Sequence, residues 1–69
     1  MIRVMEDDEI KEFLKDEEFP VAVWVRYDVH DIDSPWEFIK VNVDEAWLHN
    51  AFVFNSMNEA LEELSKYYN

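Results

Sequence analysis

The sequence predicts a single small two-layer α+β domain over residues 1–69, with the element order α-β-β-β-α and a three-stranded antiparallel sheet that carries two helices on one face. Apolar residues recur at helical spacing near both ends of the chain, and they alternate at period two in between. The links between the expected strands are short, which favours antiparallel neighbours. Two amphipathic helices and one small sheet bury their apolar faces as two layers around one core.

The first helix is expected over residues 6–18. Ile10, Phe13 and Leu14 stand at positions i, i+3 and i+4, so they form an apolar stripe along one side. Acidic residues fill the first turn, where the helix dipole stabilises negative charge. The helix is expected to stop before Pro20, because the residue that precedes a proline avoids the helical conformation.

Three strands are expected in the middle of the chain. Residues 21–29 place an apolar or aromatic side chain at every second position, mostly valine, and this is the strongest strand signal in the sequence. Residues 36–43 are expected to form the second strand and residues 46–54 the third, with a kink or bulge near His49 and Asn50. The polar segment 30–35 is typical of a turn or short loop.

The second helix is expected over residues 57–67. Ser56 and Glu59 have the spacing of a capping box, in which the serine hydroxyl accepts from the glutamate backbone N–H and the glutamate side chain reaches back. Leu61 and Leu64 follow at helical spacing and would face the core.

The valine face of the first strand is expected to meet the two helices. The core would then also hold Tyr27, and it would take Ile39, Val41 and Val43 from the second strand and Leu48, Phe52 and Phe54 from the third. The opposite sheet face would carry all three tryptophans, Trp24, Trp36 and Trp47, and an aromatic patch on a small domain usually marks an interface. Two alternatives remain open: residues 1–5 or a bent strand could cover the patch, or a one-residue register slip could exchange the faces of a strand.

Negative charge dominates the composition. Seventeen acidic residues stand against six basic ones, which gives a formal net charge of −11 and a sequence pI near 4.2. Binding to DNA, RNA or an anionic membrane needs clustered lysine and arginine, so these partners are excluded and a basic protein partner is expected. Eight of the seventeen acids lie within residues 6–18, where only Lys11 and Lys15 oppose them.

Part of this charge is expected to form a ridge. Glu9, Glu12 and Asp16 are spaced i, i+3 and i+7 on the expected helix, with Asp8 beside them. Arginines on a phosphate-binding protein surface accept carboxylates as well as phosphates. In size and charge the chain is similar to the small DNA-mimic inhibitors of phages and mobile elements, and to acidic immunity proteins and antitoxins that block basic nucleases. The resemblance implies an inhibitor of a basic nucleic-acid-handling protein, with the ridge supplying charge and the tryptophans anchoring the contact.

Two other interpretations of the surface stay open. The acidic side chains could serve solubility alone, although a small domain needs a net charge of only about 2–8 for that. The tryptophan face could instead be a self-complementary dimer interface, which would make the chain a homo-oligomeric accessory protein.

The composition also excludes several classes of site. The chain has no glycine, so the P-loop, the dinucleotide-binding fingerprint and the serine nucleophile elbow are absent. It has no cysteine, which fits a reducing compartment. No apolar stretch is long enough to span a bilayer, and the start turns acidic where a signal peptide would be apolar. We expect a cytoplasmic protein without cofactor or enzymatic activity.

Two weaker candidates for chemistry remain. Asp28, His30, Asp31 and Asp33 offer oxygen and nitrogen ligands for a divalent metal, but their spacing matches neither a calcium loop nor a zinc site. His49 could act as a general base, but no motif places a nucleophile beside it. We therefore expect neither a metal site nor a catalytic residue.

Overall fold

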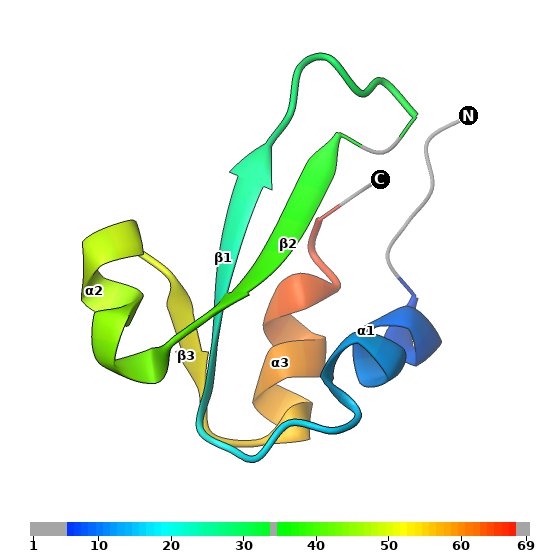
Figure 1. The fold of residues 1–69 in the computed structure, drawn as a ribbon. Coiled ribbons are helices and arrows are strands. Elements are labelled where there is room, and N and C mark those ends of the chain that lie inside the picture. The colour runs from blue at the N-terminus through cyan, green and yellow to red at the C-terminus, as the bar shows by residue number, and fades with distance from the viewer. Residues whose placement is uncertain (1–5, 34, 68–69) are drawn as a thin grey trace.

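The computed structural model describes residues 6–33 and 35–67, and it is a small α+β domain (Figure 1). The elements in order are α1 (Asp7–Leu14), β1 (Val21–Tyr27), β2 (Trp36–Val41), a 3₁₀ turn η1 (Val43–Glu45), α2 (Ala46–His49), β3 (Phe52–Phe54) and α3 (Met57–Leu64). The fold class is confirmed. The predicted order α-β-β-β-α is wrong, because a short helix precedes the third strand and the order is α-β-β-α-β-α.

The sheet has the strand order β2-β1-β3, and both pairings are antiparallel. β1 therefore lies at the centre and the other two strands are edges. Trp24 of β1 stands opposite Ile39 of β2, and Ala22 stands opposite Val53 of β3. Because side chains alternate along a strand, these four residues share one sheet face.

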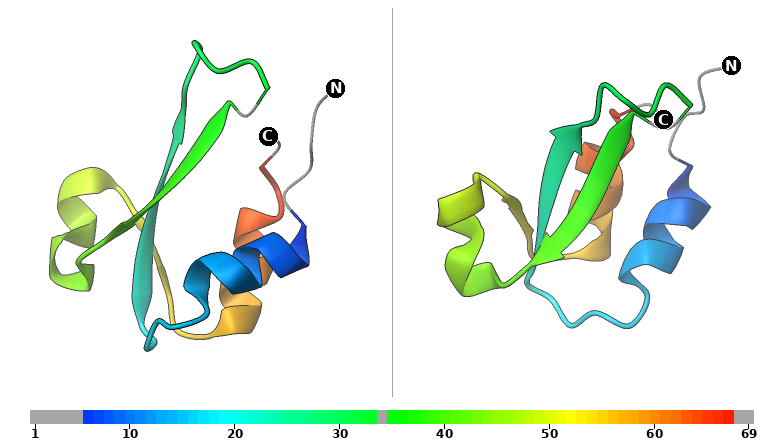
Figure 2. Two further views of the ribbon diagram at one scale, coloured as in Figure 1. Left: turned by 45° about the vertical axis from the view of Figure 1, so that its right-hand side comes forward. Right: turned by 45° about the horizontal axis from the view of Figure 1, so that its top comes forward.

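The helices lie on both sides of this sheet. Figures 1 and 2 show α1 and α3 side by side on one face, whereas α2 lies on the other side, beyond β1 and β3. We call the face that meets α1 and α3 the inner face, and the opposite one the outer face. The prediction of two helices on one face thus holds for the two longer helices, and α2 is an addition to it.

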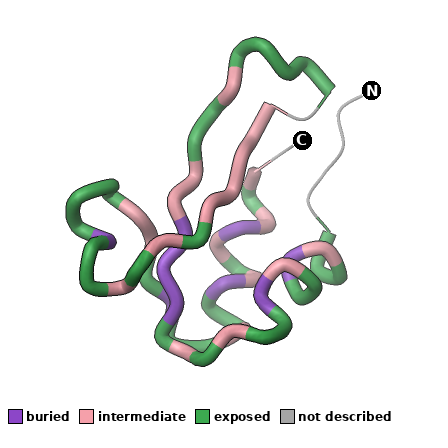
Figure 3. Tube along the Cα trace, viewed as in Figure 1, coloured by how far each residue is buried: buried purple, intermediate pink, exposed green. Residues whose placement is uncertain are grey.

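The core fills the space between the inner face and the two longer helices. Buried positions gather where β1, α1 and α3 meet (purple in Figure 3). The buried cluster consists of Ile10, Leu14, Val21, Val23, Phe54, Ala60 and Leu64. Partly buried rings of Phe13, Phe38 and Phe52 pack against it. The loop that joins β1 to β2 stands away from this core (Figure 1).

The predicted facing of the second strand is wrong. Phe38 packs against the core cluster and pairs with Val25, so the inner face takes Trp36, Phe38 and Lys40 rather than Ile39 and Val41. Both faces of this strand carry apolar residues, so the alternation alone does not decide which face is inward. The pairing register decides it, since a shift of one residue exchanges the faces.

A short helix replaces the first half of the predicted third strand. The side chain of Asn42 accepts a hydrogen bond from the backbone N–H of Asp44 at 3.0 Å, which starts the η1 turn that leads into α2. Asn50 ends α2 in the left-handed conformation with φ of 52°, which asparagine tolerates better than most residues. Leu48 consequently lies on an exposed helix, not in the core as predicted.

The remaining boundaries differ by a few residues. α1 ends at Leu14 instead of residue 18, and α3 ends at Leu64 instead of residue 67. β1 ends at Tyr27, whose side chain is largely exposed, so its predicted place in the core is wrong. The serine half of the capping box is confirmed, because the Ser56 hydroxyl accepts from the Glu59 backbone N–H at 3.3 Å. The Glu59 carboxylate reaches back as predicted, but it accepts from the Asn55 backbone N–H at 2.7 Å.

Candidate functional site

The acidic ridge predicted on the first helix is only partly a helix surface. Asp8 and Glu12 are exposed on α1, and Glu9 beside them is half-buried. Asp16 is also exposed, but it lies in the turn after the helix, since α1 ends at Leu14. The four residues therefore do not form a regular row along one helix.

Glu12 of this ridge has an ion-pair partner within the molecule. The Glu12 carboxylate lies 2.9 Å from the Lys15 ammonium, and both side chains are largely exposed. Such a pair contributes about 0–1 kcal/mol, so an arginine from a partner could displace the lysine at little cost. Asp8 and Asp16 form no ion pair within residues 6–33 and 35–67. Both side chains are accessible negative charges near α1.

Lys40 fixes the end of α1 against the sheet. Its ammonium lies 2.9 Å from the Glu17 carboxylate and donates to the Phe13 carbonyl at 3.3 Å. It also lies 5.2 Å from the centre of the Phe13 ring, a cation–π distance. A positive charge beside the last turn stabilises the carbonyl end of a helix. Lys40 therefore adds a polar contact between α1 and β2 to the apolar packing of Ile10 and Leu14 in the core.

The three predicted tryptophans do not share a face. Trp36 lies on the inner side, with its ring 4.9 Å from Tyr67 and 5.1 Å from Tyr27. Trp24 lies on the outer face, where its ring stands 5.7 Å from that of His49 and the Arg26 guanidinium lies 5.7 Å from its centre. The prediction of one open tryptophan face is wrong, because Trp36 follows the inward register of β2.

The outer face keeps a smaller apolar surface. Trp47 of α2 is 77% exposed and Leu48 beside it is also exposed, and Trp24, Ile39, Val41 and Val53 lie on the sheet nearby. α2 covers part of this sheet face, because Ala22 and Ala46 are both buried. The alternative that residues 1–5 cover the patch falls on residues outside those described. We call Trp47, Leu48, Trp24, Ile39, Val41 and Val53 the outer patch.

α1 and α2 lie on opposite sides of the sheet (Figure 2), so the sheet separates the acidic residues of α1 from Trp47 and Leu48 of α2. A partner with a flat surface therefore contacts one of them but not both. Asp8, Glu9, Glu12 and Asp16 were predicted to share one partner contact with Trp24, Trp36 and Trp47. In the structure, the sheet separates α1 from Trp24 and Trp47. Trp47 is linked to the Trp24 side of the sheet only through α2, whose His49 ring lies 5.7 Å from that of Trp24.

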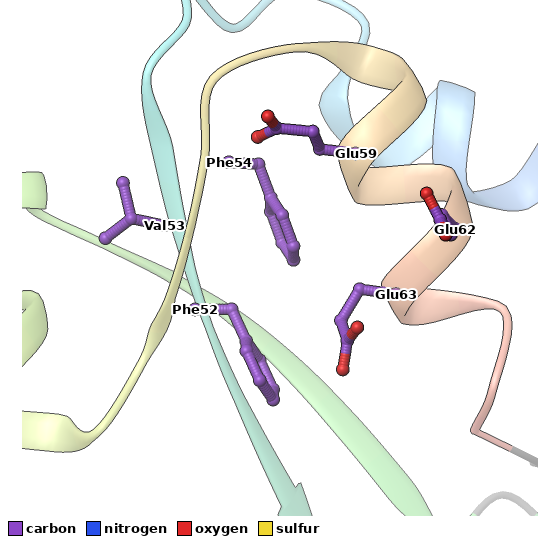
Figure 4. Close-up of a pocket in the computed structure, with 6 residues that line it drawn as sticks. All are labelled: Phe52, Val53, Phe54, Glu59, Glu62 and Glu63. Atoms are coloured by element: carbon purple, nitrogen blue, oxygen red, sulfur yellow. The ribbon is translucent and has the colours of Figure 1, made fainter.

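The structure has a third candidate surface that was not predicted from the sequence. A groove of about 400 Å³ runs between β3 and α3 and is lined by Phe52, Val53, Phe54, Glu59, Glu62 and Glu63 (Figure 4). The sequence contains a signal for its acidic side. Glu59, Glu62 and Glu63 are spaced i, i+3 and i+4 in the predicted helix 57–67, so they share one helix face. We call these six residues the β3–α3 groove.

The candidate metal residues form a turn instead. The Asp28 carboxylate accepts from the His30 backbone N–H at 2.9 Å, and the Asp28 carbonyl accepts from the Asp31 backbone N–H at 3.3 Å. The first bond is that of an Asx turn and the second is that of a β-turn, both of which are ordinary for aspartate in a loop. Within the part of the chain that the structure describes, no group of three or more histidine, cysteine or carboxylate side chains could hold a metal ion.

His49 packs beside Trp24, and Ser56 serves as the N-cap of α3. Among residues 6–33 and 35–67, no hydrogen bond joins His49 to Ser56. Among the described residues, no helix is long and apolar enough to cross a bilayer.

Comparisons of this chain with protein-family models, with curated proteins and with solved structures found no match. The function is therefore inferred from the charge and the exposed surfaces of the chain itself.

Proposed function

We propose that this chain is a non-enzymatic acidic module that binds a basic protein, and that it inhibits a nucleic-acid-handling protein by occupying the surface that holds phosphates. The observation that carries the proposal is the concentration of charge around α1. Residues 6–18 contain eight acids and two lysines, a formal sum of −6 out of −11 for the whole chain. Asp8, Glu12 and Asp16 present part of this charge on exposed side chains.

The excess of charge is larger than solubility requires. A small domain is kept soluble by a net charge of about 2–8, and further charge destabilises the fold through self-repulsion. A role in recognition explains why this cost is tolerated. Exposed carboxylates act mainly by steering a cationic partner during association, which makes the association rate depend on salt.

The exposed carboxylates suit an arginine-rich surface. A guanidinium donates two parallel hydrogen bonds to a carboxylate as it does to a phosphate. The exposed side chains of Asp8 and Asp16 are accessible to arginines on such a surface. A chain of this kind competes with nucleic acid for its partner, and it does so without a catalytic group.

Competition on a DNA resin tests the proposal. Proteins from a lysate of the source cells are loaded on double-stranded DNA resin at about 0.05 M salt and then challenged with the chain. We expect selective release of one or a few proteins, with less release by the double variant Asp8→Asn/Asp16→Asn. The control variant Asp44→Asn/Glu45→Gln loses the same charge from exposed positions in η1 and should release them like the unmodified chain.

Polyglutamate at the same carboxylate concentration is the second control. If it releases the same proteins, the chain is an unspecific polyanion and the proposal fails. Release of no protein also overturns it.

A second candidate function rests on the outer patch. Trp47 is the most exposed aromatic side chain of this patch, and Leu48 next to it is also exposed. A two-fold contact through this surface would make the chain a homodimer. Sedimentation at several concentrations tests this: a dimer that Trp47→Lys converts to a monomer supports it, and a monomer at every concentration removes it.

A further inference from the structure

We propose that the free edge of β3 and the β3–α3 groove together take an extended basic segment of the partner, which adds to the sheet as a fourth strand. This inference rests on the proposed function and names where, and in which conformation, a basic partner docks. Such strand addition obtains affinity from backbone hydrogen bonds and specificity from alternate side chains.

The edge of β3 is the first argument. β3 pairs with β1 on one side, and no strand of the described residues pairs with its other side. Exposed edges are usually protected by charged side chains. β2, the other edge, carries Glu37 and Lys40, each held in an ion pair. β3 has the sequence Phe-Val-Phe and no charge of its own. It is therefore the edge that accepts a further strand more readily.

The groove beside this edge is the second argument. Phe52 and Phe54 point from β3 towards α3, and their rings stack with centres 6.1 Å apart (Figure 4). Phe54 is buried and Phe52 is half-buried, so the groove has an apolar floor. Figure 4 also shows Glu59 and Glu63 extending from α3 towards the strand. An added strand would thus meet aromatic rings below and carboxylates at the rim.

The glutamates at the rim of the β3–α3 groove favour basic side chains in the docking segment. Three glutamates line the groove, and Lys66 opposes only one of them, with its ammonium 3.1 Å from the Glu63 carboxylate. The Glu59 carboxylate accepts from the Asn55 backbone N–H at 2.7 Å. Glu62 is exposed and forms no ion pair within the described ranges 6–33 and 35–67. An arginine or lysine fits here, because its stem covers the Phe52 ring while its charged head reaches the glutamates.

The alternation of the strand defines the rest of the segment. Residues of an added strand point in turn to the inner and the outer face. A residue on the outer face would lie beside Val53, which is 44% exposed and belongs to the outer patch. The segment therefore alternates basic residues, which face α3, with apolar residues, which face Val53.

A second copy of this chain is a poorer occupant. Two β3 edges paired about a two-fold axis would bring both α3 helices to the same side of the joined sheet. The glutamates of one copy would then face those of the other, and each copy carries a net charge of −11. Like charges opposed across a strand pair are destabilising. Charge thus favours a basic partner over self-pairing at this edge.

Synthetic peptides test the inference on the full chain. The probe alternates arginine and valine over about eight residues, enough to cover the three residues of β3 with overhang. A second peptide of the same composition has all arginines before all valines, so it keeps the charge and loses the alternation. Binding is followed by amide NMR shifts and amide hydrogen exchange of the chain. We expect the alternating peptide to bind about tenfold more tightly than the block peptide, with shifts on β3 and α3 and new amide protection within Phe52–Phe54.

Two variants and one control locate the contact. Glu62→Lys reverses one exposed rim charge and Val53→Lys puts a charge on the edge strand, and each should weaken the alternating peptide about tenfold. Glu18→Lys makes the same charge change at an exposed position after α1 and should leave the affinity nearly unchanged. Equal affinity of the two peptides, shifts confined to α1, equal loss in Glu18→Lys, or no binding overturns the inference.

The DNA-resin assay distinguishes a wrong docking site from a wrong proposed function. If Glu62→Lys and Val53→Lys still release the same proteins as the unmodified chain, a basic partner is bound elsewhere and only the groove is wrong. If the unmodified chain releases nothing, the proposed function itself fails.

Discussion

The ring of Trp36 lies 4.9 Å from that of Tyr67 in an edge-to-face arrangement, which joins the start of β2 to the residues that follow α3. Phe38 adds to this contact, with its ring 6.1 Å from Tyr67. A tryptophan expected on an open sheet face thus lies between the sheet and the C-terminal segment. Its role is in the fold, whereas Trp47 remains available on the surface.

Replacement of these two tryptophans should therefore have different effects. Trp36→Leu removes the ring contacts with Tyr27 and Tyr67, and each aromatic pair contributes about 0.5–1.5 kcal/mol beyond burial. We expect it to lower the free energy of unfolding by about 2 kcal/mol in urea titrations. Trp47→Leu, at a 77% exposed position, should change it by less than about 0.5 kcal/mol. An equal loss in both variants would contradict the placement of Trp36.

Lys40 should stabilise the fold more than the other surface lysines. Lys40→Met keeps the aliphatic stem but removes the ion pair with Glu17 and the hydrogen bond to Phe13. We expect a loss of about 1 kcal/mol in the free energy of unfolding. Lys66→Met is the matched control, because Lys66 lies in the turn after α3 and pairs only with Glu63 three residues before it, and such local pairs contribute about 0.3–0.5 kcal/mol. Similar values for the two variants would show that Lys40 does not join α1 to β2.

The N-cap of α3 should be a separate source of stability. Ser56→Ala removes the acceptor of the Glu59 backbone N–H, and the loss of such a cap costs about 0.5–2 kcal/mol. Ser56→Asp keeps an acceptor and should restore most of the stability. Both values come from chemical denaturation. A stable Ser56→Ala variant would mean that the cap is unimportant.

Leu64 and Leu48 test the assignment of the core. Both were predicted to be buried, but the structure buries Leu64 completely and leaves Leu48 57% exposed. Leu64→Ala should cost about 2–5 kcal/mol, enough to unfold much of so small a domain, whereas Leu48→Ala should remain folded. Circular dichroism during heating distinguishes them. A folded Leu64→Ala and an unfolded Leu48→Ala would restore the predicted third strand.

The sequence was informative where one residue type has one physical role. Ser56 and Glu59 predicted the start of α3, and the alternating valines predicted β1, because capping and period-two burial depend on local chemistry. The facing of β2 could not be predicted in this way, since both of its faces carry apolar residues and the register with β1 decides between them.

The short helix α2 was missed for a different reason. Its apolar residues resemble a strand, and its limits are set by two asparagines, Asn42 at the turn before it and Asn50 at its end. The candidate surfaces depend on such details. The acidic residues near α1 were found from composition, but their separation from Trp47 follows from the position of α2 on the outer side of the sheet.

The most direct test of the proposed function is the salt dependence of partner binding. A protein released from the DNA resin is purified, and its dissociation constant with this chain is measured between about 0.05 M and about 0.5 M salt. If carboxylates replace phosphates on a basic surface, the affinity should fall steeply and continuously with salt, and less steeply for Asp8→Asn/Asp16→Asn. An affinity that stays constant over this range would contradict the account.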